Sequence, residues 1–191
     1  MKKKMDRQGR IKIFSCISLD GYVLEAGSLT EGLPEYPRPK DGDYGFREFC
    51  NSAAHAVMDG MYYASLLAQD LRLPEMEYHI IAPYETGGAA GGKHGVTVLR
   101  PEEGFGYAEA TGSLRDNSAG DIWVAGGHEL VSVLLEAGMI DEMTLNIFPV
   151  IVGSGHLLFS HGRAGQRWKP LHCTRYDNGV VQVRYTANRH E

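Results

Sequence analysis

Apolar runs of strand length alternate with helical patterns along most of this chain, and that alternation restricts the possible folds more than any other feature. Strands are predicted at 11–17, 55–59, 77–83, 95–99, 121–125 and 142–148, and helices at 44–54, 61–70, 107–116 and 128–137. Two last apolar runs, 171–176 and 180–187, flank Asp177-Asn178-Gly179, a strong signal for a β-hairpin. The order predicts an α/β fold with a mostly parallel sheet and an antiparallel edge.

The length and composition favour one domain. The chain has 191 residues, of which 43% are hydrophobic. This length is sufficient for one domain with a well-buried core and short for two. We expect a flexible basic leader at 1–10 and a single domain at 11–191. The net charge of −5 disfavours nucleic acid as a partner. Polar residues interrupt the first apolar run, so neither a secretory segment nor a membrane span is predicted.

The three cysteines, Cys16, Cys50 and Cys173, lie far apart and have no CxxC spacing. An odd number without that spacing is typical of free thiols in a reducing compartment rather than of a disulfide framework. We therefore expect a cytoplasmic protein.

A pair of glycines, Gly126-Gly127, falls between the strand predicted at 121–125 and the helix predicted at 128–137. Glycine lets a ligand approach the backbone closely, and the N–H groups at a helix N-terminus bind anions such as a diphosphate. Many turns between a strand and a helix contain glycines for geometry alone. The residues themselves leave both interpretations open.

Other patterns indicate loops rather than chemistry. Segment 25–44 has three prolines and little periodicity, which is typical of a lid or binding loop, and Asp43 could cap the following helix. Residues 87–93 have the GxxxxGK spacing of a phosphate-binding loop, but His94 replaces its Ser or Thr and a strand pattern follows. The eight histidines lack HxH or HExxH spacing, so no metal site is predicted.

Four segments carry a resemblance to a known family: SLDGYV at 18–23, VMDGMYY at 57–63, the stretch 122–159 and the closing hairpin. The stretch 122–159 is the most specific, with a strand, Gly-Gly, a helix, Ile140-Asp141-Glu142, a strand and Gly153-Ser154-Gly155. The chain resembles the dihydrofolate-reductase-like family, typified by the reductase domain of the riboflavin-biosynthesis bifunctional deaminase-reductase.

That resemblance implies a three-layer αβα fold with a central mixed sheet, usually as a homodimer. It implies reduction of a pteridine-like or ribosylaminopyrimidine-type heterocycle by hydride transfer from NADPH. In this family the glycine pair and the helix after it hold the cofactor diphosphate, and the end of the first strand lies beside nicotinamide and substrate.

The resemblance and the residues together give three sets of candidate site residues. The catalytic candidates are Asp20 and Ser18, the cofactor-binding candidates are Ile17, Asp59, Gly60, Met61, Gly126, Gly127, His128 and Glu129, and the substrate-binding candidates are Tyr22, Asp43 and Glu48. Structural alternatives stand beside them, because a turn aspartate such as Asp20 often caps its own backbone and acids near a helix start often serve the helix.

The chain departs from the family pattern at two phosphate contacts. Met61 stands where the family has an arginine, and Ala82-Pro83 replaces a serine-arginine pair. Methionine offers no donor to a phosphate, so NADH is possible, with Asp59 accepting hydrogen bonds from a ribose, or Lys93 or Arg100 could hold NADPH instead. A reductase is the leading hypothesis. A catalytically silent relative that binds a small ligand or a partner is the alternative, and a P-loop phosphotransferase is the weakest.

Overall fold

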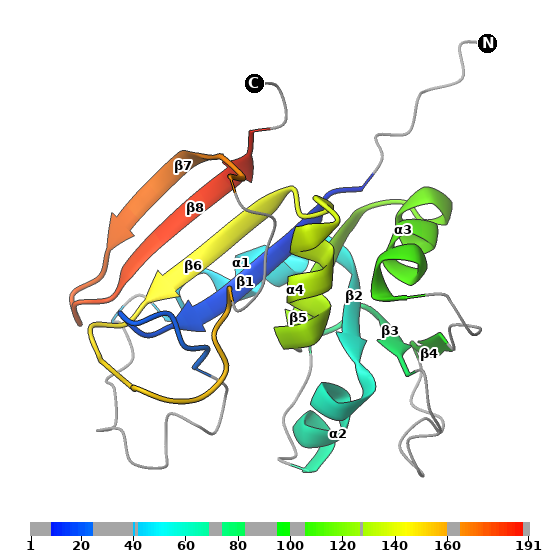
Figure 1. Cartoon of the computed structure of the whole chain (residues 1–191), viewed down its shortest axis with the longest axis horizontal. Coiled ribbons are helices and arrows are strands. Elements are labelled where there is room, and N and C mark those ends of the chain that lie inside the picture. The colour runs from blue at the N-terminus through cyan, green and yellow to red at the C-terminus, as the bar shows by residue number, and fades with distance from the viewer. Residues whose placement is uncertain are drawn as a thin grey trace.

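The computed structural model describes residues 9–24, 40, 42–68, 74–82, 95–99, 106–126, 128–159 and 165–188. Four helices and eight strands are found there (Figure 1). In chain order they are β1 (Ile11–Ile17), α1 (Phe46–Asn51), β2 (Ala53–Asp59), α2 (Gly60–Ala68), β3 (Glu77–Ile81), β4 (Val96–Leu99), α3 (Tyr107–Asn117), β5 (Asp121–Gly126), α4 (His128–Glu136), β6 (Glu142–Ile147), β7 (Trp168–Arg175) and β8 (Val181–Ala187).

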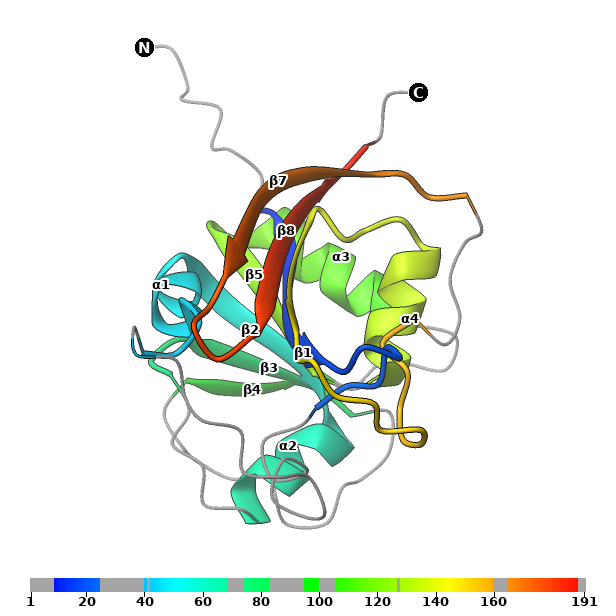
Figure 2. The same ribbon diagram turned by 90° about the vertical axis from the view of Figure 1, so that its left-hand side faces the viewer.

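All eight strands form one sheet in the order β4-β3-β2-β5-β1-β6-β8-β7. Every pairing from β4 to β6 is parallel, whereas β8 runs antiparallel to both β6 and β7. The sheet twists strongly between β4 and the terminal hairpin (Figure 2), as the right-handed twist of strands requires. The predicted mixed, mostly parallel sheet with an antiparallel C-terminal hairpin is confirmed.

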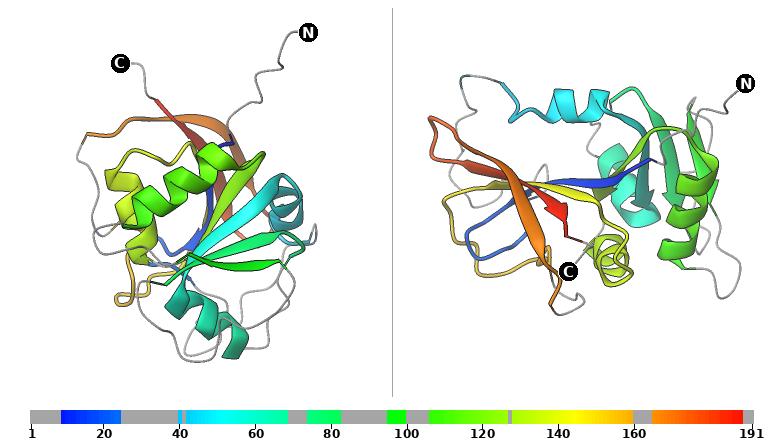
Figure 3. Two further views of the ribbon diagram at one scale, coloured as in Figure 1. Left: turned by 90° about the vertical axis from the view of Figure 1, so that its right-hand side faces the viewer. Right: turned by 90° about the horizontal axis from the view of Figure 1, so that it is seen from above.

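Helices cover both faces of the sheet, which makes the predicted three-layer αβα arrangement. Cys50 of α1 and the α2 residues Tyr63 and Leu66 pack with Met58 and Trp123 on one face. On the other face, α3 and α4 cover a larger core, whose helical members are Leu114, Leu130, Val131, Leu134 and Leu135. Figure 3 shows α1 on one side of the sheet and α3 and α4 on the other.

The first helix is shorter than the pattern 44–54 predicts. Tyr44 and Gly45 have φ angles of 58° and 78°, which a right-handed helix does not tolerate, so α1 begins at Phe46. Asp43 still serves the helix start, because its carboxylate accepts the N–H groups of Gly45 (3.1 Å) and Arg47 (3.0 Å). Ala53, predicted as helix, begins β2 instead.

Some predictions fall outside the described residues. These are the basic leader at 1–8, most of the loop 25–44, the glycine-rich segment with Lys93 and His94, Arg100, Pro83 and Gly127. Among the helices that are described, none is long and apolar enough to cross a bilayer.

Candidate active site at the carboxyl ends of the parallel strands

The carboxyl ends of β2, β5, β1 and β6 meet at one edge of the sheet, because these four neighbouring strands are parallel. In open α/β sheets, ligands bind in the crevice outside these strand ends. Ile17, Asp59 and Gly126 are the last residues of β1, β2 and β5. Predicted site residues from three separate segments are therefore brought to one edge.

The turn after β1 is fixed by its own hydrogen bonds. The Tyr22 N–H donates to Ser18 Oγ (3.0 Å), the Ser18 N–H donates to the Tyr22 carbonyl (2.9 Å), and the Gly21 N–H donates to the Ser18 carbonyl (3.1 Å). Ser18 is buried, with 1% of its surface exposed. The structure therefore gives Ser18 a role in shaping the turn and leaves its predicted catalytic role without a contact that supports it.

Asp20 connects this turn to the segment after β6. Its carboxylate accepts the N–H groups of Val152 (3.1 Å) and Gly153 (2.8 Å). The Ser18 hydroxyl does most to hold the pKa of Asp20 below its usual value; desolvation opposes it, and the amides of Gly153 and Val152 add smaller lowering effects. A carboxylate that stays ionised is a poor proton donor at neutral pH, so the geometry favours a structural role for Asp20.

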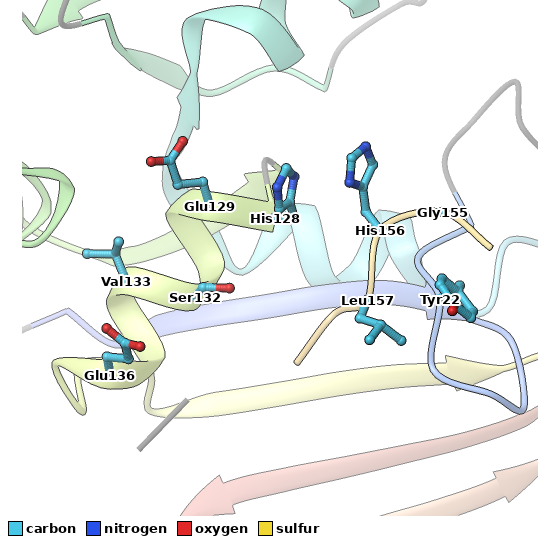
Figure 4. A pocket seen from close by; sticks show the side chains of 9 residues that line it. All are labelled: Tyr22, His128, Glu129, Ser132, Val133, Glu136, Gly155, His156 and Leu157. Carbon is cyan, nitrogen blue, oxygen red and sulfur yellow. The ribbon is translucent and has the colours of Figure 1, made fainter. Parts of the chain in front are cut away.

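A pocket of about 560 Å³ lies beside this turn, between α4 and the segment 155–157 (Figure 4). Its volume is within the range of small-molecule sites. The lining residues are Tyr22 from the β1 turn, His128, Glu129, Ser132, Val133 and Glu136 from α4, and Gly155, His156 and Leu157. Tyr22, His128 and Glu129 are thus predicted site residues that the structure brings together in the lining of one pocket.

Two histidines meet at one end of the pocket. The rings of His128 and His156 stack with their centroids 4.2 Å apart and their planes 11° from parallel. In Figure 4 both rings stand side by side, His128 on the first turn of α4 and His156 on the opposite segment. They join the two walls of the pocket and place in it two imidazoles, the side chain most often used as a general acid or base.

Position 126 must be a glycine because the Tyr62 ring packs directly against its backbone. A Cβ atom built on it would lie 2.4 Å from the Tyr62 ring, and its φ of 155° is one that other residues rarely adopt. The close approach that a glycine permits is therefore used at least in part by Tyr62, as the geometric reading of the Gly126-Gly127 turn predicts.

The start of α2 is arranged differently from a phosphate site. The Asp59 carboxylate accepts the Tyr62 N–H (2.8 Å) and caps the helix, and Asp59 is only 7% exposed. Gly60 is buried, whereas the Met61 side chain is 74% exposed and offers no donor. Glu129 and Asp59 are both close enough to Tyr107 to raise the pKa of that phenol, although burial raises it more. The space between these helix starts is therefore negatively charged.

The remaining predicted residues lie elsewhere. Ile17 is buried in the large core under α3 and α4. Asp43 and Glu48 belong to the start of α1, and neither lines the described pocket. Sequence reasoning missed the α4 residues Ser132, Val133 and Glu136, although helical spacing from His128 and Glu129 places them on the same face. It also missed His156, which only the tertiary fold brings to His128.

The family model described as the RibD C-terminal domain matches residues 94–182, a little under half of the chain. Two Bacillus subtilis (strain 168) proteins, both named as uncharacterized, are similar in sequence. YwjB is 26% identical over 174 residues, which cover 91% of this chain and 95% of YwjB. YyaP is 34% identical over 80 residues, which cover 42% of this chain and 43% of YyaP. For YyaP the similarity therefore spans less than half of either protein.

Solved structures are similar over nearly the whole chain. A Shewanella sp. PV-4 protein named for riboflavin biosynthesis superposes with a TM-score of 0.78 at 19% identity, covering 94% of this chain and 99% of that one. Enterococcus faecalis dihydrofolate reductase, in complex with NADP(H) and RAB-propyl, superposes with a TM-score of 0.64 at 15% identity, covering 95% of this chain and 98% of that one. The chain has the dihydrofolate-reductase-like fold. Within that class, its sequence is similar to the RibD C-terminal domain, as the sequence motifs predict.

The described residues fit one part of the nicotinamide cofactor that this fold implies. The first turn of α4 lines the pocket, and the N–H groups of a helix start favour a diphosphate. Among the described residues, the pocket lining includes Glu129 and Glu136 and has no Lys or Arg that could attract the 2′-phosphate of NADPH.

Proposed function

We propose that this protein is a reductase that transfers hydride from a nicotinamide dinucleotide to a small heterocycle. The observation that supports it best is the pocket at the start of α4, at the carboxyl edge of a parallel sheet in a dihydrofolate-reductase-like fold. The match of residues 94–182 to the RibD C-terminal domain adds to it, because that segment contains most of the pocket.

The protein's own residues would bind and orient the reactants. The N–H groups at the start of α4 bind an anion, and the β1 turn with segment 155–157 forms the facing wall, which Asp20 holds in place. His128 or His156 is positioned to pass a proton to a reduced ring, a role that the ionised Asp20 fills less well. When bound, the reduced nicotinamide supplies the hydride.

We further propose that the protein prefers NADH to NADPH. Glu129 and Glu136 would repel an additional phosphate, and Met61 provides no cation to attract it. Titrating the protein with each cofactor and following nicotinamide fluorescence tests this preference. Binding of NADPH clearly tighter than that of NADH would contradict it. Binding of neither would contradict the reductase proposal itself and favour a silent relative that binds a ligand in the same pocket.

The variant Met61→Arg sharpens this test. An arginine at this exposed position adds a donor fork for phosphate, so the affinity for NADPH should rise about tenfold while that for NADH changes little. The matched control is Leu171→Arg, which adds the same charge at another exposed apolar residue, on β7. An equal rise for both cofactors, or an equal rise in the control, would mean that Met61 does not face the extra phosphate.

The substrate class is part of the proposal. We propose a pteridine-like or ribosylaminopyrimidine-type heterocycle, as used by a dihydrofolate reductase or a 5-amino-6-(5-phosphoribosylamino)uracil reductase. Oxidation of NADH in the presence of each substrate, followed by absorbance, distinguishes the two. A homodimer in the cytoplasm, without nucleic acid or membrane as a partner, completes the proposal, and all three cysteines are unpaired.

A further inference from the structure

Three potential metal ligands gather near the amino ends of β2 and β3, away from the pocket at the carboxyl ends. His55 is paired with Glu77 across the two parallel strands, and His79 follows Glu77 by two residues, so all three side chains are on the same face of the sheet. Within the described part of the chain, no other three His, Cys, Asp or Glu side chains are grouped this closely.

The distances within this group fit one small cation. His55 Nδ1 is 3.2 Å from His79 Nε2 and 3.2 Å from a Glu77 carboxylate oxygen, and the third separation, from His79 Nε2 to Glu77, is 4.0 Å. A point between these three atoms is about 2 Å from each, which is the length of a zinc bond to imidazole nitrogen or carboxylate oxygen. That point lies in the plane of the three atoms, so a tetrahedral ion requires the 4.0 Å separation to shorten, which a small rotation of the exposed Glu77 side chain would supply.

A backbone carbonyl orients the first of the two histidines. His55 Nε2 lies 3.1 Å from the carbonyl oxygen of Ala119, which can accept only if the ring proton is on Nε2. That tautomer leaves the Nδ1 lone pair pointing at His79 and Glu77. Metal-binding histidines are commonly held in this way by an acceptor on the other nitrogen.

The group is incompletely satisfied by its own hydrogen bonds. With the His55 proton on Nε2, the Nδ1 lone pair accepts the His79 Nε2–H, and the Glu77 oxygen at 3.2 Å faces the same lone pair with no proton of His55 between them. A cation at the centre would replace this repulsion by three attractive contacts.

We propose that His55, Glu77 and His79 bind one Zn²⁺ ion, with solvent in the fourth position. Two imidazoles and a carboxylate are a donor set that zinc prefers. The two histidine side chains are only 9% and 10% exposed, whereas Glu77 is 67% exposed and leaves a path to solvent. The site has no HxH or HExxH motif in the sequence, because its ligands come from two neighbouring strands that are separate in the chain. The ion would hold β2, β3 and the residues before β5 together.

The first test uses the full chain after treatment with a chelator, titrated with ZnCl₂ in a calorimeter. One Zn²⁺ ion per chain should bind, and thermal unfolding should shift upward only when zinc is present. Glu77→Gln should weaken binding about tenfold and His79→Gln about 100-fold. His172→Gln, which replaces an exposed histidine on β7, is the matched control and should leave the affinity unchanged.

Absence of zinc binding by the unmodified chain would overturn the proposal. So would binding that survives both Glu77→Gln and His79→Gln, which would place the ion elsewhere, for example at His128 and His156. Glu77 is exposed, so its replacement should leave the chelated protein as stable as before, and loss of zinc in this variant cannot be attributed to unfolding.

Nuclear magnetic resonance of the histidine rings gives an independent result. Zinc should shift the Nδ1 resonance of His55 and the Nε2 resonance of His79, while the proton on His55 Nε2 remains bonded to Ala119. Loss of the His55 Nε2 proton on zinc binding, or a larger zinc-induced shift at Nε2 than at Nδ1, would contradict the arrangement described above.

Discussion

The carboxylate of Asp20 is the one side chain of the β1 turn that adds hydrogen bonds to the segment after β6, among the described residues. Its two hydrogen bonds reach Val152 and Gly153, just before the wall residues Gly155, His156 and Leu157. Backbone hydrogen bonds also join the β1 turn to the segment after β6: the Leu19 N–H donates to the Val150 carbonyl (2.9 Å), and the Val23 N–H donates to the His156 carbonyl (2.8 Å). Because the pKa of Asp20 is lowered, mainly by the Ser18 hydroxyl, its carboxylate stays ionised to a lower pH than that of a free aspartate.

The variant Asp20→Asn should loosen the segment after β6 around Val152 and Gly153 without unfolding the core. An amide is a weaker acceptor than a carboxylate, so the Val152 and Gly153 amides should exchange with deuterium several-fold faster, and cofactor affinity should fall. Hydrogen exchange followed by mass spectrometry measures the change, with the amides of β1 as an internal control. Unchanged protection at Val152 and Gly153 would show that other contacts hold the wall.

At the scale of elements, the sequence predicted nearly all helices and strands because their hydrophobic periodicity is regular. The pattern placed the start of α1 too early, because Tyr44 and Gly45 have positive φ angles and a positive φ is not expected for a tyrosine. In β6, the alternation of Met143 and Leu145 predicts one buried face, yet Thr144 and Asn146 are buried too, because β6 lies inside the sheet.

The candidate site was predictable mainly on the side formed by α4, and on the opposite wall only Tyr22 was predicted, from the family resemblance. His128 and Glu129 follow a glycine turn between a strand and a helix, which is a recognisable signal. The opposite wall depends on how the segment after β6 folds back, and the pairing of Tyr22 with Leu157 has no sequence signature. The zinc candidate likewise depends on the register between two strands.

Packing of α2 against the end of β5 can be tested at Gly126. Gly126→Ala should lower the free energy of unfolding by about 1–3 kcal/mol, because the added methyl group meets the Tyr62 ring. Chemical denaturation of the single variants and of the double variant with Tyr62→Ala measures the coupling. The penalty should shrink by about 1 kcal/mol once the ring is absent.

Gly138→Ala is the matched control for this cycle. Gly138 has a φ of 65° and open space around it, so its replacement carries only backbone strain, about 1 kcal/mol. That cost should be the same with or without Tyr62. Strict additivity between Gly126→Ala and Tyr62→Ala would contradict the packing explanation.

For the molecule as a whole, charges at the amino ends of the strands fasten β1 to its neighbours. Lys12 Nζ lies 2.5 Å from the Asp121 carboxylate, and Arg10 contacts both Asp121 and Glu142. Burial raises the pKa of Asp121, but the hydrogen bonds and charges of Lys12 and Arg10 outweigh it and leave that pKa below its usual value. This cluster lies at the edge opposite the pocket.

The stability of the protein should therefore depend on Asp121 in acid. Because the pKa is lower in the folded chain than in the unfolded chain, the stabilisation is fully present above about pH 4 and is lost as the pH falls through the folded value. Asp121→Asn should lower the free energy of unfolding by about 2 kcal/mol at pH 7. In acid, the free energy of unfolding of this variant should depend less steeply on pH.

Urea unfolding at a series of pH values measures both effects. Asp177→Asn is the control, because Asp177 pairs with Lys40 at 3.8 Å on the surface, and its replacement should cost less than about 0.5 kcal/mol. Equal pH dependence in Asp121→Asn and the unmodified chain would show that other carboxylates cause the acid sensitivity.

The position of β1 in the middle of the sheet has a consequence for how the chain folds during synthesis. The partners of β1, strands β5 and β6, lie in the second half of the sequence. Arg10 and Asp121, which pair at the amino ends of β1 and β5, are 111 residues apart. A growing chain on the ribosome must therefore keep an apolar strand unpaired until the second half emerges. Incomplete chains that end before β6 lack one of the two partners of β1 and the wall of the pocket that faces α4. They should therefore depend on chaperones and bind no ligand.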